Sequence, residues 1–316
     1  LDKSSRTVEE TIAIEARGAR VESSVDHLHL VASDSKAALQ EKRAEDVGVG
    51  DWILIARPDP SGISEVEIGA KPIRKGLKNW WPTVTLDEGW ARLIGLWLAE
   101  GHGGVYTRGN TGRERNTLAE VKWSFGGAEE HFADEVLEIL RARGISASKK
   151  YVESKNCTYG TSRTWLVRCR SLWLWTFFQK LGLGSLSADK RAPDLHVDFV
   201  PAMVGGWLDG DGNDYAGAIS GYSRSTGMIA DMWRLVAKAG ILASVNHGGE
   251  RLDIGGIEDA AIVAGWTKRL KSEKIRTRET RDPKWVVHPS GWLAKVGKVE
   301  RIVGPTRVVA IETTTG

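Results

Sequence analysis

Two acidic residues, each followed by glycine, end two apolar stretches of similar sequence. The first stretch reads Leu-Ile-Gly-Leu-Trp-Leu-Ala-Glu-Gly over residues 93–101, and the second reads Val-Gly-Gly-Trp-Leu-Asp-Gly-Asp-Gly over residues 204–212. Glu100 and Asp211 would stand at the negative ends of two helices, where a carboxylate is unfavourable without a cation nearby. Carboxylate oxygens suit Mg²⁺, and a divalent ion offsets their mutual repulsion. The two acids therefore predict a shared metal site.

Small residues recur four apart in both stretches, so they lie along one stripe of each helix. Glycine inside a helix costs about 1 kcal/mol relative to alanine, so these glycines, with Gly205, need a compensating reason such as close helix packing. We expect the two helices to pack backbone to backbone with their acids side by side. The residues of the two stripes are Gly95, Ala99, Gly206 and Gly210.

The glycines that follow the acids, Gly101 and Gly212, fit the helix C-terminal position that favours a left-handed backbone. We include both of them with the acids in the expected metal site. The glycine-rich residues 101–104 lack the ending of a phosphate-binding loop, so we interpret them as the turn out of the first helix.

The elements that must position the acids repeat in one order: helix, hairpin, helix, hairpin, helix. Alternating apolar and polar residues predict a strand over 118–125, and apolar residues at helical spacing predict a helix over 129–143. Further strands are expected over 145–153 and 161–169 and a helix over 171–181; after the second stretch we expect a strand over 215–222, a helix over 225–239, strands over 241–247 and 251–254, and a helix over 257–270.

Charge is distributed unevenly along the chain. The net charge of +3 is too small to indicate nucleic-acid binding by itself. Basic residues dominate 141–170 and 268–284, whereas residues 1–51 carry more acids than bases. We therefore do not expect the N-terminal segment to contact a polyanion, and ordinary solvated surface charge is the alternative reading of the basic stretches.

The paired stretches and the repeated order of elements resemble the LAGLIDADG homing endonucleases over residues 86–275, including the link at 190–193. This resemblance implies an α+β fold of two pseudo-symmetric αββαββα repeats, whose saddle-shaped antiparallel sheets lie over the DNA major groove. It implies a monomer that hydrolyses both strands of a long asymmetric site with Mg²⁺ or Mn²⁺, whereas Ca²⁺ occupies the site without turnover. The first stretch departs from the pattern, with Leu98 opposite Asp209 and Glu100 in place of aspartate.

The resemblance also assigns basic and strand residues. The family places a basic residue near the scissile phosphates, which corresponds here to Lys190 and Lys274 after the closing helices, although an ordinary surface role is the alternative. With Glu100 and Asp211, these lysines form the expected catalytic set. The expected DNA contacts are Glu120, Lys122, Ser124, Lys149, Lys150, Arg163, Arg168 and Arg170.

The segments that flank these repeats resemble the split halves of an intein (Hint) self-splicing domain. Short β-like runs with turn residues between them occur within 16–55 and 291–312. Ser24 and His27 stand where that family has Thr-x-x-His, although a buried structural histidine is the alternative for His27. Leu1 and the end at Gly316 supply no splicing nucleophile or His-Asn pair, so we expect either trimmed ends or a domain that only supports folding and DNA binding.

We therefore expect an intein-like N-terminal part over 1–78, repeat 1 over 79–192, repeat 2 over 193–280 and an intein-like C-terminal part over 281–316. A protein-splicing element with its splicing ends missing and an RNA-binding intron maturase are the alternative functions. The sequence has no long apolar span and no signal-peptide pattern, so we expect a soluble cytoplasmic protein without membrane contact.

Overall fold

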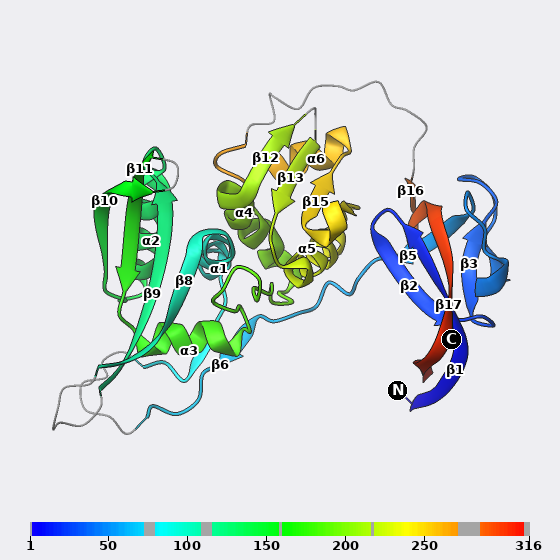
Figure 1. The fold of residues 1–316 in the computed structure, drawn as a ribbon, viewed down its shortest axis with the longest axis horizontal. Coiled ribbons are helices and arrows are strands. Elements are labelled where there is room, and N and C mark those ends of the chain that lie inside the picture. The colour runs from blue at the N-terminus through cyan, green and yellow to red at the C-terminus, as the bar shows by residue number, and fades with distance from the viewer. Residues whose placement is uncertain are drawn as a thin grey trace. The chain divides into compact units, whose positions relative to one another are not determined.

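The structure is a computed structural model that describes residues 2–72, 80–108, 116–157, 160–215, 218–270 and 285–312 (Figure 1). The chain divides into two compact units. Unit 1 comprises residues 1–58, 242–245 and 279–316, and unit 2 comprises residues 59–241 and 246–278. The first and last segments of the chain therefore belong to the same unit.

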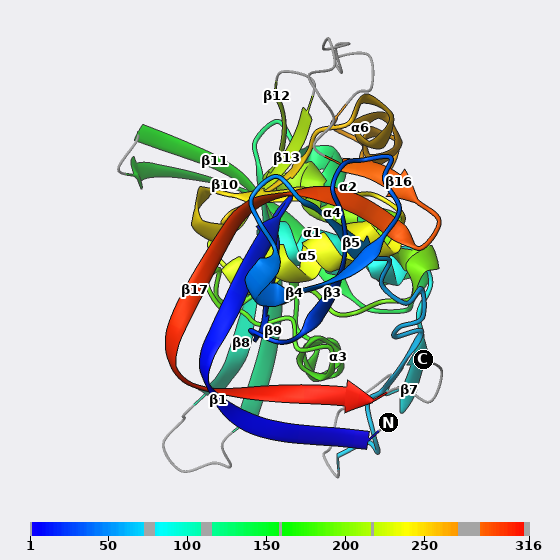
Figure 2. The same cartoon turned by 90° about the vertical axis from the view of Figure 1, so that its right-hand side faces the viewer.

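Unit 1 is built on a seven-stranded sheet with the order β2-β1-β17-β5-β3-β4, and β16 pairs with β17. Strands β1 and β17 are antiparallel from the Asp2–Glu312 pair to the Ala16–Val296 pair, as Figure 2 shows. Its strands are β1 (Asp2–Ala16), β2 (Ala19–Ser24), β3 (Leu28–Ala32), β4 (Gln40–Arg43), β5 (Trp52–Ala56), β16 (Trp285–His288) and β17 (Gly291–Glu312).

In unit 2 the two acid-tipped stretches form helices α1 (Glu88–Glu100) and α4 (Val200–Asp211). Asp87 begins α1 because its side chain accepts a hydrogen bond from the Trp90 backbone N–H. Pro201 lies in the first turn of α4, where its missing N–H costs nothing. Both helices lead directly into strands, β8 (Gly101–Arg108) and β12 (Gly212–Tyr215).

Two antiparallel four-stranded sheets follow these helices, in the orders β8-β9-β11-β10 and β12-β13-β15-β14. When the strands of each sheet are numbered along the chain, both sheets therefore have the spatial order 1-2-4-3. The mixed α and β composition with antiparallel sheets is as expected. The other elements are β9 (Asn116–Gly126), α2 (Glu130–Ala142), β10 (Ala147–Cys157), β11 (Gly160–Cys169), α3 (Leu172–Lys180), β13 (Ala218–Tyr222), α5 (Thr226–Lys238), β14 (Ser244–Asn246), β15 (Arg251–Ile254), α6 (Ile257–Ala264), the short pair β6 (Glu65–Glu67) and β7 (Thr83–Thr85), and three 3-10 turns.

The core of the first sheet follows from the alternation in β9. Its inward residues are all buried, and the Trp123 ring lies 5.8 Å from that of Trp97 on α1. Phe178 of α3 packs on the same tryptophan, 4.7 Å from the Trp97 ring. Burial of three large aromatic rings anchors α1 beneath this sheet. The inward residues of β9 are Ala119, Val121, Trp123 and Phe125.

Three local expectations are wrong. Residues 101–104 begin β8 instead of forming a turn. Gly101 and Gly212 are extended, with φ of −86° and −89°, rather than left-handed. Glycine is required for space: a Cβ at Gly101 would lie 2.4 Å from the Trp97 ring, and one at Gly212 would lie 2.2 Å from the Leu208 carbonyl oxygen.

The bounds of three other elements also differ from expectation. Helix α6 ends at Ala264, six residues before the expected end at Leu270. Strand β14 occupies only Ser244–Asn246, and the single strand expected over 215–222 is replaced by the antiparallel strands β12 and β13. In the ranges that the structure describes, helices are too short or too polar to cross a bilayer.

Candidate metal centre

Helices α1 and α4 approach each other at the backbone. A Cβ on Gly95 would lie 2.0 Å from the Met203 carbonyl oxygen, and one on Gly206 would lie 2.7 Å from the Arg92 carbonyl oxygen. A side chain larger than hydrogen at either glycine would push the helices apart. The close packing expected from the small residues is therefore present.

This packing brings the two acids together. A Cβ on Gly210 would lie 3.2 Å from the Glu100 Oε1 atom, so Glu100 lies against the residue that precedes Asp211. Both acids are half-buried. Burial, followed by the negative charge of Asp211, raises the pKa of Glu100 to about 7. Burial also raises the pKa of Asp211 to about 6, although the positive charge of Lys190 opposes the change.

Lys190 lies at the same helix ends. The residue is buried, with 5% of its surface exposed, and its Nζ donates to the carbonyl oxygens of Leu98 at 2.9 Å and Ala99 at 3.3 Å. Burial lowers the pKa of Lys190 to about 8, whereas the charges of Asp211 and Glu100 raise it. The ammonium is thus fixed at the negative end of α1, next to both acids.

Sequence reasoning missed Arg269. Its guanidinium donates to the Gly212 carbonyl oxygen and lies 3.6 Å from the Glu129 Oε1 atom. Its charge acts to lower the pKa of both Glu100 and Asp211, so it belongs to the same site. The signal available in the sequence was a basic residue in the last turn of the helix predicted over 257–270. Lys274, which we expected in this role, lies outside the described residues.

The acidic residues present fit a divalent ion whose ligands come partly from the protein and partly from a substrate. Among the described residues, no three Asp, Glu, His or Cys side chains converge in a way that would hold a metal. Mg²⁺ is commonly bound by one or two carboxylates together with water and substrate phosphates. Glu100 and Asp211 meet this requirement. The Gly212 carbonyl already accepts a hydrogen bond from Arg269, and the expected role of Gly101 stays a prediction.

A cavity of about 280 Å³ opens beside Asp211 and Lys190. It lies between the C-terminal ends of α1 and α4 and the second sheet, and polar side chains supply much of its wall. A phosphate-sized group can therefore reach Asp211 and Lys190 from this side. Its lining residues are Leu98, Ala99, Ser187, Lys190, Asp211, Tyr222, Ser223, Arg224 and Glu250.

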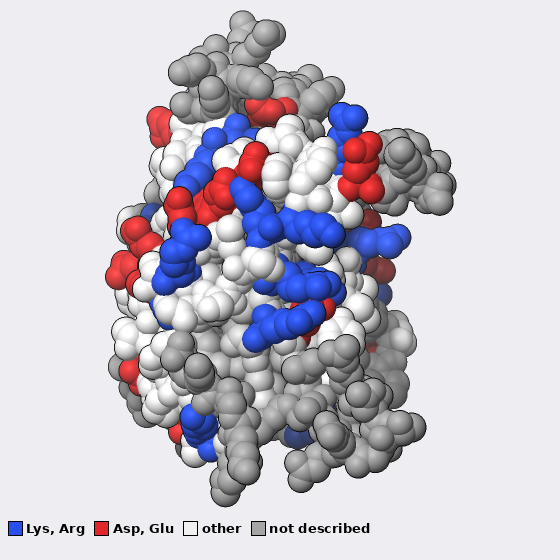
Figure 3. All heavy atoms as spheres, turned by 90° about the vertical axis from the view of Figure 1, so that its left-hand side faces the viewer, with Lys and Arg blue, Asp and Glu red and all other residues white. Residues whose placement is uncertain are grey.

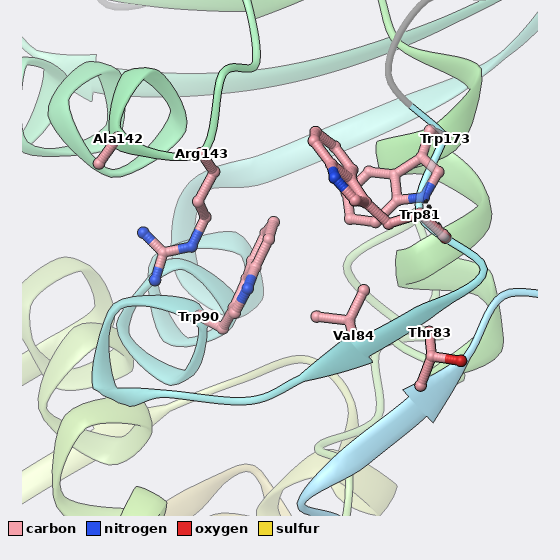
Figure 4. A pocket seen from close by; sticks show the side chains of 7 residues that line it. All are labelled: Trp81, Thr83, Val84, Trp90, Ala142, Arg143 and Trp173. Carbon is pink, nitrogen blue, oxygen red and sulfur yellow. Dashed lines mark hydrogen bonds between the residues drawn. The ribbon is translucent and has the colours of Figure 1, made fainter.

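A larger cavity, of about 380 Å³, lies at the opposite end of α1 (Figure 4). There the Arg143 guanidinium lies 4.7 Å from the Trp90 ring, and on the other side of the hollow the Trp81 and Trp173 rings contact each other at 4.8 Å. Arg143 also forms an ion pair with Asp87, the residue that begins α1. These contacts fix the start of the helix, about 18 Å along its axis from Glu100.

The outward face of the first sheet carries several of the residues expected to contact DNA. Lys122 is paired with Arg168 across β9 and β11, and both form ion pairs with Glu120, at 2.6 Å and 2.8 Å. Arg170 lies 3.5 Å from the same carboxylate. Ser124 shares this face because it lies two residues from Lys122 in β9. Lys150 shares it because it pairs with Leu166, which lies two residues from Arg168 in β11. Figure 3 shows Lys and Arg side chains gathered on the side of the molecule that carries this sheet.

Lys149 and Arg163 do not join that face. The pairs Lys149–Val167 and Glu153–Arg163 place both on the side of the sheet that packs on α2. Lys149 forms ion pairs with the helix residues Glu130 at 2.7 Å and Asp134 at 2.5 Å. The period of two in a strand separates these bases from Lys122 and Arg168.

The expected splicing residues lie in unit 1. Ser24 is buried and accepts a hydrogen bond from Arg6 at 3.4 Å. His27 is exposed, so the alternative of a buried histidine is wrong. Its ring lies 4.9 Å from that of His29, and His29 contacts the Ser23 hydroxyl at 3.0 Å. The serine–histidine contact at this place therefore involves Ser23 and His29.

The chain was compared with known proteins. Its sequence matches no model of a protein family, and no curated protein matches it. Among solved structures, it is similar to I-WcaI, a homing endonuclease bound to its DNA recognition sequence, with 14% identity, 67% of this chain and 96% of that chain covered, and a TM-score of 0.43. It is also similar to I-DmoI in complex with DNA and Mn, with 15% identity, 55% of this chain and 92% of that chain covered, and a TM-score of 0.38.

Proposed function

We propose that unit 2 is a metal-dependent endonuclease that hydrolyses both strands of double-stranded DNA at a long asymmetric site, acting as a monomer. The observation that carries this proposal is the meeting of Glu100 and Asp211 at the ends of two packed helices, beside a buried lysine. One chain supplies both acids, so no second copy is needed to complete the site.

The proposed architecture is two pseudo-symmetric αββαββα repeats, over 79–192 and 193–280. The shared strand order of the two sheets supports this division. Each sheet would form half of a saddle whose outward face lies in the major groove, which is wide enough to admit a β-ribbon.

Glu100 and Asp211 would hold Mg²⁺ or Mn²⁺, with Ca²⁺ binding in their place without turnover. The bound ion would lower the pKa of water and stabilise the leaving oxygen. Lys190, held by two carbonyl groups, places a fixed positive charge where the phosphate gains negative charge, and Arg269 supplies a second one. Both cations need no reorganisation because the protein already orients them.

The DNA would contact the outward face of the first sheet. Arg168 and Arg170 can donate to phosphates or to guanine edges, and Lys122 to phosphates. Glu120 orients these three cations through its ion pairs. We leave Lys149 and Arg163 out of this set because they face α2.

The test is cleavage of a randomised duplex library with Mg²⁺. We expect Glu100→Gln and Asp211→Asn each to abolish double-strand cutting and to leave DNA binding within about threefold, because each keeps its shape but loses a metal ligand. Glu130→Gln, an exposed acid on α2, is the matched control and should cut normally. Unchanged cutting by either site variant would overturn the assignment, and tighter binding of intron RNA than of duplex DNA would favour a maturase.

A second proposal concerns unit 1. We propose that it is the intein-like domain expected over 1–78 and 281–316, with its first half ending at residue 58 because residues from 59 belong to unit 2, and with its two halves separated in sequence by the nuclease. The pairing of β1 with β17 supports this, because it joins the two ends of the chain in one sheet. A longer chain with a nucleophile before β1 and a His-Asn pair after β17 should ligate its flanks. Absence of ligated product would leave unit 1 with a supporting role only.

A further inference from the structure

Helix α4 has a second contact face, distinct from the one that packs on α1. Gly205 and Asp209 are four residues apart, so they lie on one side of the helix. A Cβ on Gly205 would lie 1.9 Å from the Trp266 carbonyl oxygen. The helix backbone therefore packs directly on the segment that follows α6.

Asp209 binds that segment through its side chain. The residue is fully buried, and its Oδ1 accepts hydrogen bonds from the backbone N–H groups of Lys268 at 2.9 Å and Arg269 at 2.8 Å. Its Oδ2 lies 2.6 Å from the Arg92 Nη2, and Arg92 is held in turn by Glu135. A buried carboxylate with this many partners fixes the backbone at residues 268 and 269.

The fixed backbone sets the position of the Arg269 guanidinium. From there the side chain reaches the Gly212 carbonyl oxygen, directly after Asp211. The first stretch has no carboxylate at the corresponding position. Leu98 stands opposite Asp209, and it is the backbone oxygen of Leu98 that accepts from Lys190. The two cations of the site are thus held in different ways.

We propose that Asp209 is a positioning residue that acts through Arg269, holding its guanidinium beside the Glu100–Asp211 pair. The inference rests on the proposed function for its chemical meaning. Asp209 itself is engaged by backbone N–H groups and by Arg92, so it contributes to the site only through the segment that it binds.

The test uses Ca²⁺ alone, titrated by calorimetry into the full chain. Arg269→Gln removes a positive charge near the acids and should tighten Ca²⁺ binding by roughly threefold to tenfold. Asp209→Ala should produce the same shift, because the guanidinium moves away, and the double variant should match either single variant. Asp209→Asn keeps an oxygen for the two N–H groups and should stay within about twofold of wild type.

Single-turnover cutting is the second readout. Arg269→Gln and Asp209→Ala should each slow cutting by at least about tenfold with DNA binding unchanged, and again without a further loss in the double variant. If Asp209→Ala does not fold, Gly205→Ala displaces the same segment and must give the same Ca²⁺ shift. A shift with Arg269→Gln alone, or multiplicative effects in the double variant, would overturn the positioning role.

The outcomes separate the two proposals. If the Arg269 and Asp209 variants change Ca²⁺ affinity equally and without addition, but the chain cuts no duplex, the positioning role stands and the proposed nuclease activity is overturned. If the chain cuts duplex DNA but the two variants change Ca²⁺ affinity independently, the nuclease activity stands and the positioning role is overturned. A wild-type chain that binds no Ca²⁺ at millimolar concentration would overturn both.

Discussion

At the residue scale, the candidate site brings together two acids and a lysine, and burial disfavours the charged form of each. Burial raises the pKa of Glu100 to about 7 and that of Asp211 to about 6, and it lowers the pKa of Lys190 to about 8. Each shift disfavours the charged form of its group in the metal-free chain. Such perturbed groups, gathered in a cavity, are typical of functional sites, because folding alone would favour apolar residues there.

The free energy of unfolding should report the Glu100 shift. The folded-state pKa of about 7 lies above the ordinary value of 4.5, so the folded chain binds the extra proton and loses stability as pH rises toward 7. Glu100→Gln removes this loss. In EDTA we expect it to stabilise the chain by about 2 kcal/mol at pH 8 and to change little at pH 5. Urea unfolding at both values measures this, and an equal gain at both would contradict it.

Lys190 offers a second test at this scale. Lys190→Met keeps the apolar stem but removes the charge and the donor to the Leu98 and Ala99 carbonyl oxygens. We expect single-turnover cutting to fall by about 100-fold, with DNA affinity within about threefold, because the charge acts where the phosphate gains negative charge. Lys150→Met, on the outward sheet face, is the control and should affect affinity instead. A loss of affinity that explains the whole effect of Lys190→Met would refute this role.

At the element scale, α4 presents one glycine-lined face to α1 and another to the segment after α6. Gly206→Ala should therefore destabilise the chain although alanine favours helices by about 1 kcal/mol. The new Cβ would lie 2.7 Å from the Arg92 carbonyl oxygen, and we expect a net loss of about 2 kcal/mol in urea unfolding followed by tryptophan fluorescence. Gly104→Ala, whose Cβ would have only contacts of 3.8 Å or more, is the control. Equal stability of the two variants would mean that α1 and α4 can move apart to accommodate the new Cβ at no cost in free energy.

Periodicity predicted most of the elements, because burial on one face leaves a pattern within a single segment. The alternation in β9 and the helical spacing in α2 are local in this sense. The paired helices and their acids were predictable for a related reason, since glycine stripes and terminal acids are visible in each stretch. Periodicity did not predict β1, whose partner β17 lies near the other end of the chain.

The remaining misses depend on contacts distant in sequence. Helix α6 was expected to continue to Leu270, but the backbone N–H groups of Lys268 and Arg269 bind Asp209, some sixty residues earlier. That contact also brings Arg269 to the site. Similarly, strand register decides that Arg168 lies outward and Arg163 toward α2, although both are basic residues of one strand. Neither fact can be read from the residue types alone.

At the scale of the whole molecule, the net charge of +3 hides a division of bases between the faces of the first sheet. The outward group comprises Lys122, Arg168 and Arg170 around Glu120, whereas Lys149 is neutralised by the acids of α2. DNA affinity should therefore depend on which face loses charge, because only bases that reach phosphates release counterions.

Two double variants with the same loss of charge test this division. Lys122→Gln with Arg168→Gln removes two outward cations and leaves Glu120 with Arg170 as its partner, so affinity should fall at least about 30-fold and the slope of log K against log salt should decrease by about two. Lys149→Gln with Arg163→Gln should change affinity less than about threefold and leave the slope unchanged. Fluorescence anisotropy with a labelled duplex between 50 and 200 mM salt, roughly the range over which phosphate contacts dominate, measures both. Equal losses for the two pairs would mean that net charge, and not the outward face of the sheet, determines binding.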